Sequence, residues 1–419
     1  MIKDIVVIGG GASGLAASIS AKKRGKNVLL IEREKELGGI LNQCIHNGFG
    51  LEVFKEEYTG PEYAYKFIEE FRELNIDYLV NTTVVKLEKN DDLFIITISS
   101  ANEGLVKIKS RSVIISSGCY ERTRGQIMMP GDRPRGVITA GSAQRYLNID
   151  GLMVGKRVFI LGSGDIGLIM ARRMHLEGAK VLGVAEIMPY SNGLNRNIVQ
   201  CLNDFDIPLY LSHTVTDVLS DENKLLKGIT IQQVDTNFNP IEGTEKHFDI
   251  DTLLLSIGLI PDITLLDDLG IETDPKTKSA KINQAYETNL PGLFICGNSL
   301  QVHDLVDNVS KESFRAGNCA ADYLDNKPTE RKKINVVPGK NTLYVAPQHL
   351  DFGWSFSDLT ISFRVNKKIE KALIKVYQGE NLIYQKRRAF VVPAEMETIS
   401  FSYQDLNDYQ DLKVEMEEL

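Results

Sequence analysis

The sequence predicts an α/β fold with two strand–turn–helix domains, followed by a β-rich domain at the C-terminal end. Two short apolar strands, about 150 residues apart, each lead into a glycine-rich turn, at residues 9–14 and 162–167. Strand-like and helical segments alternate after both turns, which favours parallel sheets. From residue 334 onward only strand-like segments follow. We therefore expect a Rossmann-like domain around each turn and a separate β-rich domain.

The first turn follows an apolar strand at residues 4–8, and a helix is expected after it. The turn consists of Gly9, Gly10, Gly11, Ala12, Ser13 and Gly14. In this G-x-G-x-x-G spacing, the first glycine allows a tight turn, the second lets a pyrophosphate approach the backbone, and the third lets the helix pack closely on the strand. A second strand at residues 26–31 ends at Glu32, whose carboxylate can accept hydrogen bonds from an adenosine ribose. These features predict a dinucleotide site.

The second turn repeats this plan after a strand at residues 157–161. It consists of Gly162, Ser163, Gly164, Asp165, Ile166 and Gly167. The next strand, at residues 181–185, ends at Glu186. An acidic residue there fits a free 2′-hydroxyl and repels a 2′-phosphate, so we expect NAD(H) in preference to NADP(H). A carboxylate beside a pyrophosphate is repulsive, and Asp165 is therefore expected to point outward or to cap the helix.

A glycine-rich turn can also serve only to pack a helix, so a single match would be weak. Here both turns are followed by an acidic strand end, and both units close on an apolar strand that runs into a glycine, Gly118 or Gly258. The repetition predicts two bound dinucleotides. Two dinucleotides in one chain indicate hydride transfer between them, in which the cofactors carry the chemistry and the protein positions them.

Composition and charge limit the other functions. A chain of 419 residues is expected to form two or three domains. The net charge of −8 argues against nucleic acid or an anionic membrane as a partner. No apolar run approaches the roughly 18 residues that span a bilayer. The first strand begins almost at Met1, which leaves no room for a signal peptide, and a cytoplasmic protein is expected.

The cysteines are far apart in the sequence. They are Cys44, Cys119, Cys201, Cys296 and Cys319. No C-x-x-C pattern occurs, so neither a redox dithiol nor a bound metal is expected. The odd count suits reduced thiols.

Residues 288–298 combine a turn, a short buried strand and the pair Gly297-Asn298. A helix is expected after this segment, beginning at Asp304 or Asn308 and ending at Leu324.

The polar segment at residues 325–333 is predicted to be a linker, and residues 331–419 a β-sandwich-like domain. Residues 379–381 are a plausible hairpin turn. Strands are expected at residues 359–365, 371–377, 382–392 and 396–401.

Several of these motifs resemble those of a known family. The first turn, its acidic strand end and residues 36–39 resemble the FAD-binding start of flavoproteins with two dinucleotide-binding domains, the family of thioredoxin reductase and lipoamide dehydrogenase. Residues 288–298 are similar to the second flavin motif of that family, and Gly118 and Gly258 occupy the ends of its two linking strands. The resemblance covers residues 1–325.

The resemblance implies how the cofactors are divided. Residues 1–120 and 255–330 would form the FAD domain, and residues 121–254 an inserted NAD(H) domain. FAD would contact Gly9, Gly11, Ala12, Ser13, Gly14, Glu32, Gly39, Val85, Gly118, Gly297 and Asn298. NAD(H) would contact Gly162, Gly164, Asp165, Ile166, Gly167, Glu186 and Gly258. Val85 would reach the adenine through its backbone, and a plain strand residue is the equal alternative.

Two features depart from the family pattern. The aspartate that binds the ribityl chain is Asn298 here, and an amide can still hydrogen-bond a hydroxyl or a phosphate. The dithiol of the disulfide reductases is absent from both places where relatives carry it, because only Cys44 follows the Gly38-Gly39 pair. Disulfide reduction by a relay of two thiols is therefore not expected.

Three residues are candidates for catalysis. In the family, the segment with Cys44 and His46 runs beside the isoalloxazine, so this pair could supply a low-pKa nucleophile or a donor to flavin N5 or a substrate. The alternative is a buried cysteine beside a surface histidine. His303 could supply a proton to substrate or flavin; otherwise His303-Asp304 caps the following helix.

Residues 41–50 and 302–307 resemble a narrower group, the NAD(H)/FAD oxidoreductases found alongside anaerobic glycerol-3-phosphate dehydrogenases, with relatives among the flavin subunits of amine- and opine-oxidising complexes. This resemblance favours electron exchange with a partner dehydrogenase subunit, or with a small-molecule substrate near Cys44 and His303. Many relatives are homodimers. Two other functions stay open: a self-contained NADH oxidase or reductase of a small acceptor, and a redox-sensing or assembly subunit.

Overall fold

The computed structural model describes residues 2–101, 103–326, 332–406 and 409–419. Contacts divide the chain into two units. One is formed by residues 1–119 and 261–419, and the other by residues 120–260.

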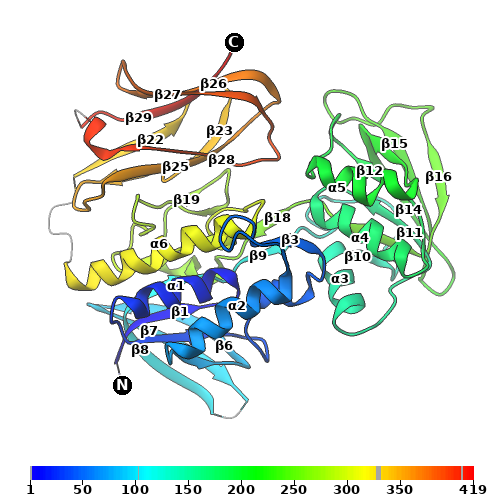
Figure 1. The fold of residues 1–419 in the computed structure, drawn as a ribbon. Helices are drawn as coiled ribbons and strands as arrows, with labels where there is room; N and C mark the ends of the chain where they lie inside the picture. The colour runs from blue at the N-terminus through cyan, green and yellow to red at the C-terminus, as the bar shows by residue number, and fades with distance from the viewer. Residues whose placement is uncertain (1, 102, 327–331, 407–408) are drawn as a thin grey trace. The chain divides into compact units, whose positions relative to one another are not determined.

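The first unit is built on a mixed sheet with the strand order β5-β2-β1-β8-β7-β6, in which β21 also pairs with β8. Figure 1 labels β1, β6, β7 and β8 of this sheet. The strands are β1 (Ile2–Ile8), β2 (Val28–Ile31), β5 (Asp77–Leu79), β6 (Thr82–Asn90), β7 (Leu93–Ser100), β8 (Gly104–Ile115) and β21 (Leu293–Ile295). The pairs among β5, β2, β1, β8 and β21 are parallel, as expected. The β6–β7–β8 meander is antiparallel, because its turns are too short for the crossover that parallel strands need.

Helices cover this sheet. They are α1 (Ala12–Lys23), α2 (Gly60–Glu73) and α6 (Val306–Asp325). Leu15 and Ile19 of α1 share a buried cluster with Ala316 and Ala320 of α6. The two helices approach so closely that a side chain at Gly317 would overlap the carbonyl oxygen of Ala17. The expected helix after the second flavin-like motif is confirmed, with its start at Val306.

Several shorter elements complete the first unit and the segments that connect it to the second. They are β3 (Asn47–Phe49), β4 (Tyr58–Thr59), β9 (Cys119–Glu121), β18 (Leu259–Pro261), β19 (Thr273–Asp274), β20 (Ser279–Ala280), η1 (Gly39–Gln43), η3 (Thr264–Leu269) and η4 (Gly297–Ser299).

The second unit repeats the plan of the first. Its parallel sheet has the order β10-β17-β11-β12-β13, and β11 and α4 flank the second turn as β1 and α1 flank the first. An antiparallel sheet of β14, β15 and β16 accompanies it. The elements are β10 (Val137–Thr139), α3 (Ala140–Asn148), β11 (Arg157–Leu161), α4 (Asp165–Leu176), β12 (Lys180–Glu186), α5 (Asn195–Cys201), η2 (Asn203–Phe205), β13 (Leu209–Leu211), β14 (His213–Ser220), β15 (Leu226–Gln233), β16 (Lys246–Asp249) and β17 (Thr252–Leu255).

The C-terminal region is β-rich, as predicted. It contains a five-stranded sheet, β24-β22-β29-β26-β27, and a three-stranded sheet, β23-β25-β28. The elements are β22 (Lys333–Pro338), β23 (Thr342–Ala346), β24 (His349–Asp351), β25 (Asp358–Val365), β26 (Ile369–Gln378), β27 (Asn381–Val391), β28 (Glu397–Ser402), η5 (Tyr403–Asp405) and β29 (Leu412–Glu418). Both sheets contribute to one buried cluster, for example Phe363 of β25 and Val376 of β26. The expected linker falls mostly on residues 327–331, which lie outside the described residues.

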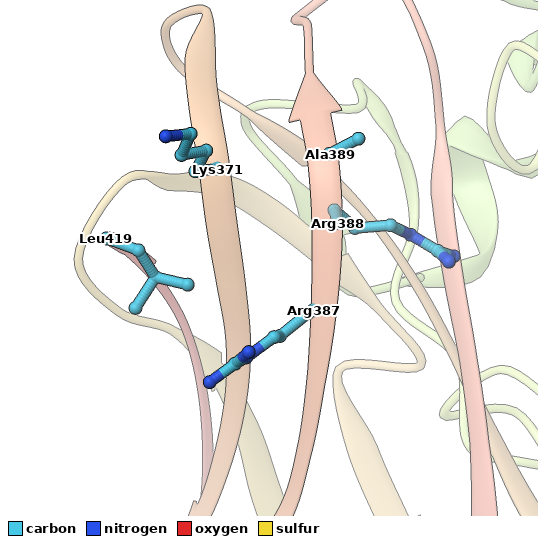
Figure 2. Close-up of a pocket in the computed structure, with 5 residues that line it drawn as sticks. All are labelled: Lys371, Arg387, Arg388, Ala389 and Leu419. Atoms are coloured by element: carbon cyan, nitrogen blue, oxygen red, sulfur yellow. The ribbon is translucent and has the colours of Figure 1, made fainter.

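A shallow pocket beside β27 is lined by Lys371, Arg387, Arg388, Ala389 and Leu419 (Figure 2). Arg387 and Arg388 extend to opposite sides of the strand, as side chains in a strand alternate. Arg388 donates a hydrogen bond to Glu397 at 2.7 Å. β27 is the edge strand of the described sheet, and charged side chains on an edge strand disfavour its pairing with a strand of another molecule.

Replacing Gly317 with alanine is expected to destabilise the first unit. The new methyl group would overlap the Ala17 backbone and force α1 and α6 apart, which costs about 1–3 kcal/mol of unfolding free energy. Gly125→Ala is the matched control, because the nearest atom to a side chain there is Thr123 Oγ1 at 3.8 Å. Urea unfolding measures both variants, and equal midpoints would contradict the close packing of α1 and α6.

Candidate functional site

The first turn permits only glycine at two positions. A side chain at Gly9, whose φ is +109°, would overlap the carbonyl oxygen of Ser116. A side chain at Gly14 would overlap the carbonyl oxygen of Gly9. These two glycines therefore let α1 begin directly against the end of β1.

Gly11 differs from its neighbours because the protein leaves space beside it. A Cβ atom at Gly11 would meet only the Cα atom of Gly39, at 3.9 Å. Gly11 is also the N-cap of α1, where backbone N–H groups and the helix dipole attract anions. Ala12 and Ser13 form the first turn of the helix, and the Ser13 hydroxyl lies 2.8 Å from that of Ser313. The open space at Gly11 fits the close approach of a pyrophosphate.

Glu32 and Gly39 lie against this turn. Glu32 is only 6% exposed, and its carboxylate accepts hydrogen bonds from the amides of Gly10 at 2.6 Å and Glu34 at 2.8 Å. A Cβ atom at Gly39 would lie 2.9 Å from Gly11 Cα. Glu32 and Gly39 therefore both lie beside the first turn. Each oxygen of the Glu32 carboxylate can still accept a hydrogen bond from a further donor.

Residues from the second flavin-like motif reach the same turn. A Cβ atom at Gly297 would lie 2.6 Å from the Ser13 hydroxyl oxygen. The amide of Gly297 donates to Glu312 at 2.7 Å, and the Asn298 side-chain oxygen accepts from the amide of His303 at 3.0 Å. The two flavin-like motifs are therefore neighbours in space.

Val85 and Gly118 are accessible. Val85 is 49% exposed and sits where the register of β6 against β7 shifts, so it has no partner across that pair. Gly118 has a φ of +78°, and no atom lies within 4 Å of the position that a Cβ atom would take there.

The imidazole of His303 is buried, with a side chain only 4% exposed. Neither of its ring nitrogens makes a hydrogen bond within the described residues, although Nε2 lies 3.2 Å from Glu312 Oε1. Buried polar atoms are almost always hydrogen-bonded, so an unsatisfied imidazole beside the second motif fits a group that meets a ligand.

Asp304 does not cap the following helix, which corrects one alternative drawn from the sequence. Its carboxylate accepts hydrogen bonds from Arg364 at 2.5 Å and from the amide of Met396 at 2.7 Å, both in the C-terminal region. The acidic residue in the first turn of α6 is Asp307. Asp307 instead accepts from the amides of the loop at residues 50–53, which follows Cys44 and His46 in the chain.

Cys44 is not an activated thiolate, which corrects the low-pKa alternative. Burial raises the pKa of its thiol to about 12, so the thiol is protonated at neutral pH. Its Sγ–H donates to the carbonyl oxygen of Ile40 at 3.3 Å. His46 Nδ1 lies 2.9 Å from the Asn47 carbonyl oxygen, and its ring lies 5.0 Å from that of Phe49.

The second turn has the same close contacts as the first. A side chain at Gly162, whose φ is +97°, would overlap the Ser256 carbonyl oxygen, and one at Gly167 would lie 2.7 Å from Ser256 Cβ. At Gly164 the nearest atom is the Ser256 hydroxyl oxygen at 3.3 Å, so this position has less room than Gly11. Gly258 lies between β17 and β18, with a φ of +103°.

Glu186 repeats the arrangement of Glu32. It is 3% exposed, and its carboxylate accepts from Ser163, through the amide at 3.0 Å and the hydroxyl at 2.7 Å. Ile166 is half-buried on α4. Asp165 accepts from the amide of Leu194 and the side chain of Asn197, so its carboxylate is engaged away from α4, as the outward alternative predicted.

The described ranges hold neither a metal-binding cluster nor a membrane-spanning helix. No group of three His, Cys, Asp or Glu side chains among them could hold a metal ion. None of the helices that the structure describes is long and apolar enough to cross a bilayer. No disulfide bond joins the cysteines of the described residues.

Residues 3–313 match the family model of the pyridine nucleotide-disulphide oxidoreductases. Among curated relatives, the HcnB subunit of hydrogen cyanide synthase from Pseudomonas protegens is 24% identical over 70% of this chain and 65% of its own length. The F subunit of alkyl hydroperoxide reductase from Staphylococcus epidermidis is 27% identical over 77% of this chain and 59% of its own length. The chain thus spans about three fifths of the length of these relatives.

Solved structures show the same fold. Thioredoxin reductase from T. acidophilum superposes with a TM-score of 0.64 at 22% identity, covering 77% of this chain and 98% of that protein. Thioredoxin reductase from Lactococcus lactis also gives 0.64, at 19% identity, with 77% and 99% covered.

Cys44 is expected to resist alkylation at neutral pH, because only the thiolate reacts and burial holds the thiol pKa near 12. Iodoacetamide labelling followed by peptide mass spectrometry should show slow modification at pH 8 that accelerates toward pH 11. The urea-unfolded chain is the control and should react at an ordinary rate. Rapid labelling of the folded protein at pH 7 would restore the activated-thiolate alternative.

Proposed function

The chain belongs to the pyridine nucleotide-disulphide oxidoreductase family, and we propose that it transfers hydride between NAD(H) and FAD and exchanges electrons with a partner dehydrogenase or a small acceptor. Members of this family bind FAD and use NAD(P)H. The observation that carries the proposal is a glycine turn with a buried carboxylate bonded to it, present once in each unit. The bound cofactors would supply the redox chemistry that side chains lack.

The residues of the first unit fit FAD. The space at Gly11 admits a pyrophosphate, and Glu32 beside it can accept from ribose hydroxyls. Gly297 and Asn298 would hold the ribityl–phosphate region, because they lie against the first turn through Ser13. We propose residues 1–120 and 255–330 as the FAD domain.

The second unit would hold NAD(H). Its turn faces the start of α4, and Glu186 is the acidic residue that would accept from the adenosine ribose. A carboxylate at this position repels a 2′-phosphate, which supports NADH over NADPH. We propose residues 121–254 as the NAD(H) domain. In it, Asp165 would keep its hydrogen bonds to Leu194 and Asn197 and would not bind the phosphates.

Proton handling is assigned to residues of the first unit. The protonated Cys44 thiol would turn its single S–H from the Ile40 carbonyl oxygen to the flavin or a substrate, and His46 would lie beside it in the same segment. The unsatisfied ring nitrogens of His303 would exchange a proton with the substrate or the flavin.

A partner protein is supported by the relatives. HcnB and the alkyl hydroperoxide reductase component are both named as subunits of larger enzymes. Residues 41–50 and 302–307 carry the finer resemblance to glycerol-3-phosphate- and amine-oxidising systems, and we keep such a dehydrogenase as the favoured partner. A two-thiol relay is not proposed, because the sequence has no C-x-x-C pattern. We also propose a cytoplasmic location, because the odd count and wide spacing of the cysteines suit reduced thiols.

Gly11→Val tests the FAD site. The backbone at Gly11 is extended, and a Cβ atom there contacts nothing closer than 3.9 Å, so the variant should fold with a stability within about 0.5 kcal/mol of wild type. The valine would nevertheless fill the space assigned to the pyrophosphate. Purified protein should therefore lose its flavin absorbance. A folded Gly11→Val protein with stoichiometric FAD would refute this assignment.

Glu186→Gln tests the choice of nicotinamide cofactor. Removing the negative charge should narrow the preference for NADH over NADPH by on the order of tenfold, because the 2′-phosphate is no longer repelled. The control is Glu242→Gln, on an exposed loop of the same unit. Dissociation constants for both nucleotides give the ratio, and an unchanged ratio would show that Glu186 does not face the ribose.

A further inference from the structure

Arg364 of β25 is buried and bonds to two separate segments. Its side chain is 14% exposed. The guanidinium donates to the carbonyl oxygen of Val302 at 3.0 Å and to Asp304 at 2.5 Å, both in the segment after the second flavin-like motif. It also donates to the carbonyl oxygens of Pro393, at 3.1 Å, and Ala394, in its own domain. Only an arginine offers enough N–H groups in a planar fork for these four acceptors.

Arg364 and Asp304 form an ion pair, and both oxygens of the Asp304 carboxylate accept hydrogen bonds. Burial opposes the charge of Arg364, but the Asp304 carboxylate and Tyr344 outweigh it and raise the guanidinium pKa. The second carboxylate oxygen of Asp304 accepts from the amide of Met396 at 2.7 Å. Both members of the pair are thus bonded to the C-terminal domain, and the segment at residues 302–304 is held by it.

The C-terminal domain that carries Arg364 also contacts the core of the first unit. Trp354 belongs to the buried core of the first unit and donates to Glu287 at 3.3 Å. Gln284 exchanges two hydrogen bonds with the backbone of Asp351, at 2.7 and 2.9 Å. Arg364 therefore acts from a domain that is itself packed into the core.

The held segment leads directly to the proposed flavin contacts. The amide of His303, between the two residues that Arg364 binds, donates to Asn298 at 3.0 Å. The His303 ring lies 3.2 Å from Glu312, and Glu312 accepts from the amide of Gly297 at 2.7 Å. Movement of residues 302–304 would therefore displace His303 and the amide that orients Asn298.

We propose that Arg364 is a positioning residue for the flavin site: by clamping Val302 and Asp304, it sets the places of His303 and Asn298 against the flavin. The C-terminal domain would then contribute directly to the geometry of the flavin site. This inference rests on the proposed function, because it needs FAD beside Gly297 and Asn298.

Variants of the full chain test the role of Arg364. Arg364→Met should slow anaerobic flavin reduction by NADH at least tenfold and shift the visible flavin spectrum and midpoint potential. Arg364→Lys should recover part of each change, because it keeps the charge but not the fork. Asp304→Asn should move the same readouts, and the double variant Asp304→Asn/Arg364→Met should be no worse than Arg364→Met alone, since the two residues act as one clamp.

Arg388→Met is the matched control, because Arg388 also binds a carboxylate, Glu397, but within the C-terminal domain. It should leave the flavin spectrum and reduction rate unchanged. Wild-type spectrum, potential and rate in Arg364→Met would overturn the positioning role. If Arg364→Met does not fold, the nearly isosteric Asp304→Asn variant tests the positioning role instead, and a wild-type flavin spectrum, potential and reduction rate in that variant would overturn it. A wild-type protein that cannot bind FAD would instead refute the proposed function itself.

Discussion

The close approach of a helix to a strand end, permitted by glycine, is the constraint on which the rest of this structure depends. Gly9 and Gly14 leave no room for a side chain at the first turn, and Gly162 and Gly167 repeat this at the second. In both units a serine on the linking strand end, Ser116 or Ser256, fills the space behind the turn. The helix N-terminus and the buried glutamate are thereby brought to one point, which is what a dinucleotide needs.

Local patterns in the sequence predicted these turns, their acidic strand ends, the helix after residue 304 and the hairpin at residues 379–381. Contacts between distant residues could not be predicted in this way. The partner of Asp304 is Arg364, and periodicity carries no signal for such a pair. The strand β29 alternates clearly, yet its parallel pairing with β22 joins residues far apart in the sequence. Of the alternatives for Cys44, the low-pKa thiol rested on adjacency to His46 in sequence, which says nothing about burial, and burial raises the pKa of this thiol.

The family match ends at residue 313, and the C-terminal domain lies beyond it. Hydrogen bonds of Arg364 and Trp354 join this domain to Asp304 and Glu287, which flank the second flavin-like motif at residues 288–298. A protonated Cys44 and the lack of a C-x-x-C pattern both fit electron exchange without a thiol relay.

Anaerobic titration of the purified protein with NADH, followed in the visible spectrum, tests the central claim most directly. The proposed hydride transfer predicts a yellow protein whose long-wavelength flavin band is bleached by about one equivalent of NADH, with NADPH much less effective. This result would establish that both nucleotides bind and that hydride passes between them. A flavin-containing protein that NADH does not bleach would contradict hydride transfer, and a colourless protein that FAD cannot reconstitute would contradict both cofactor assignments.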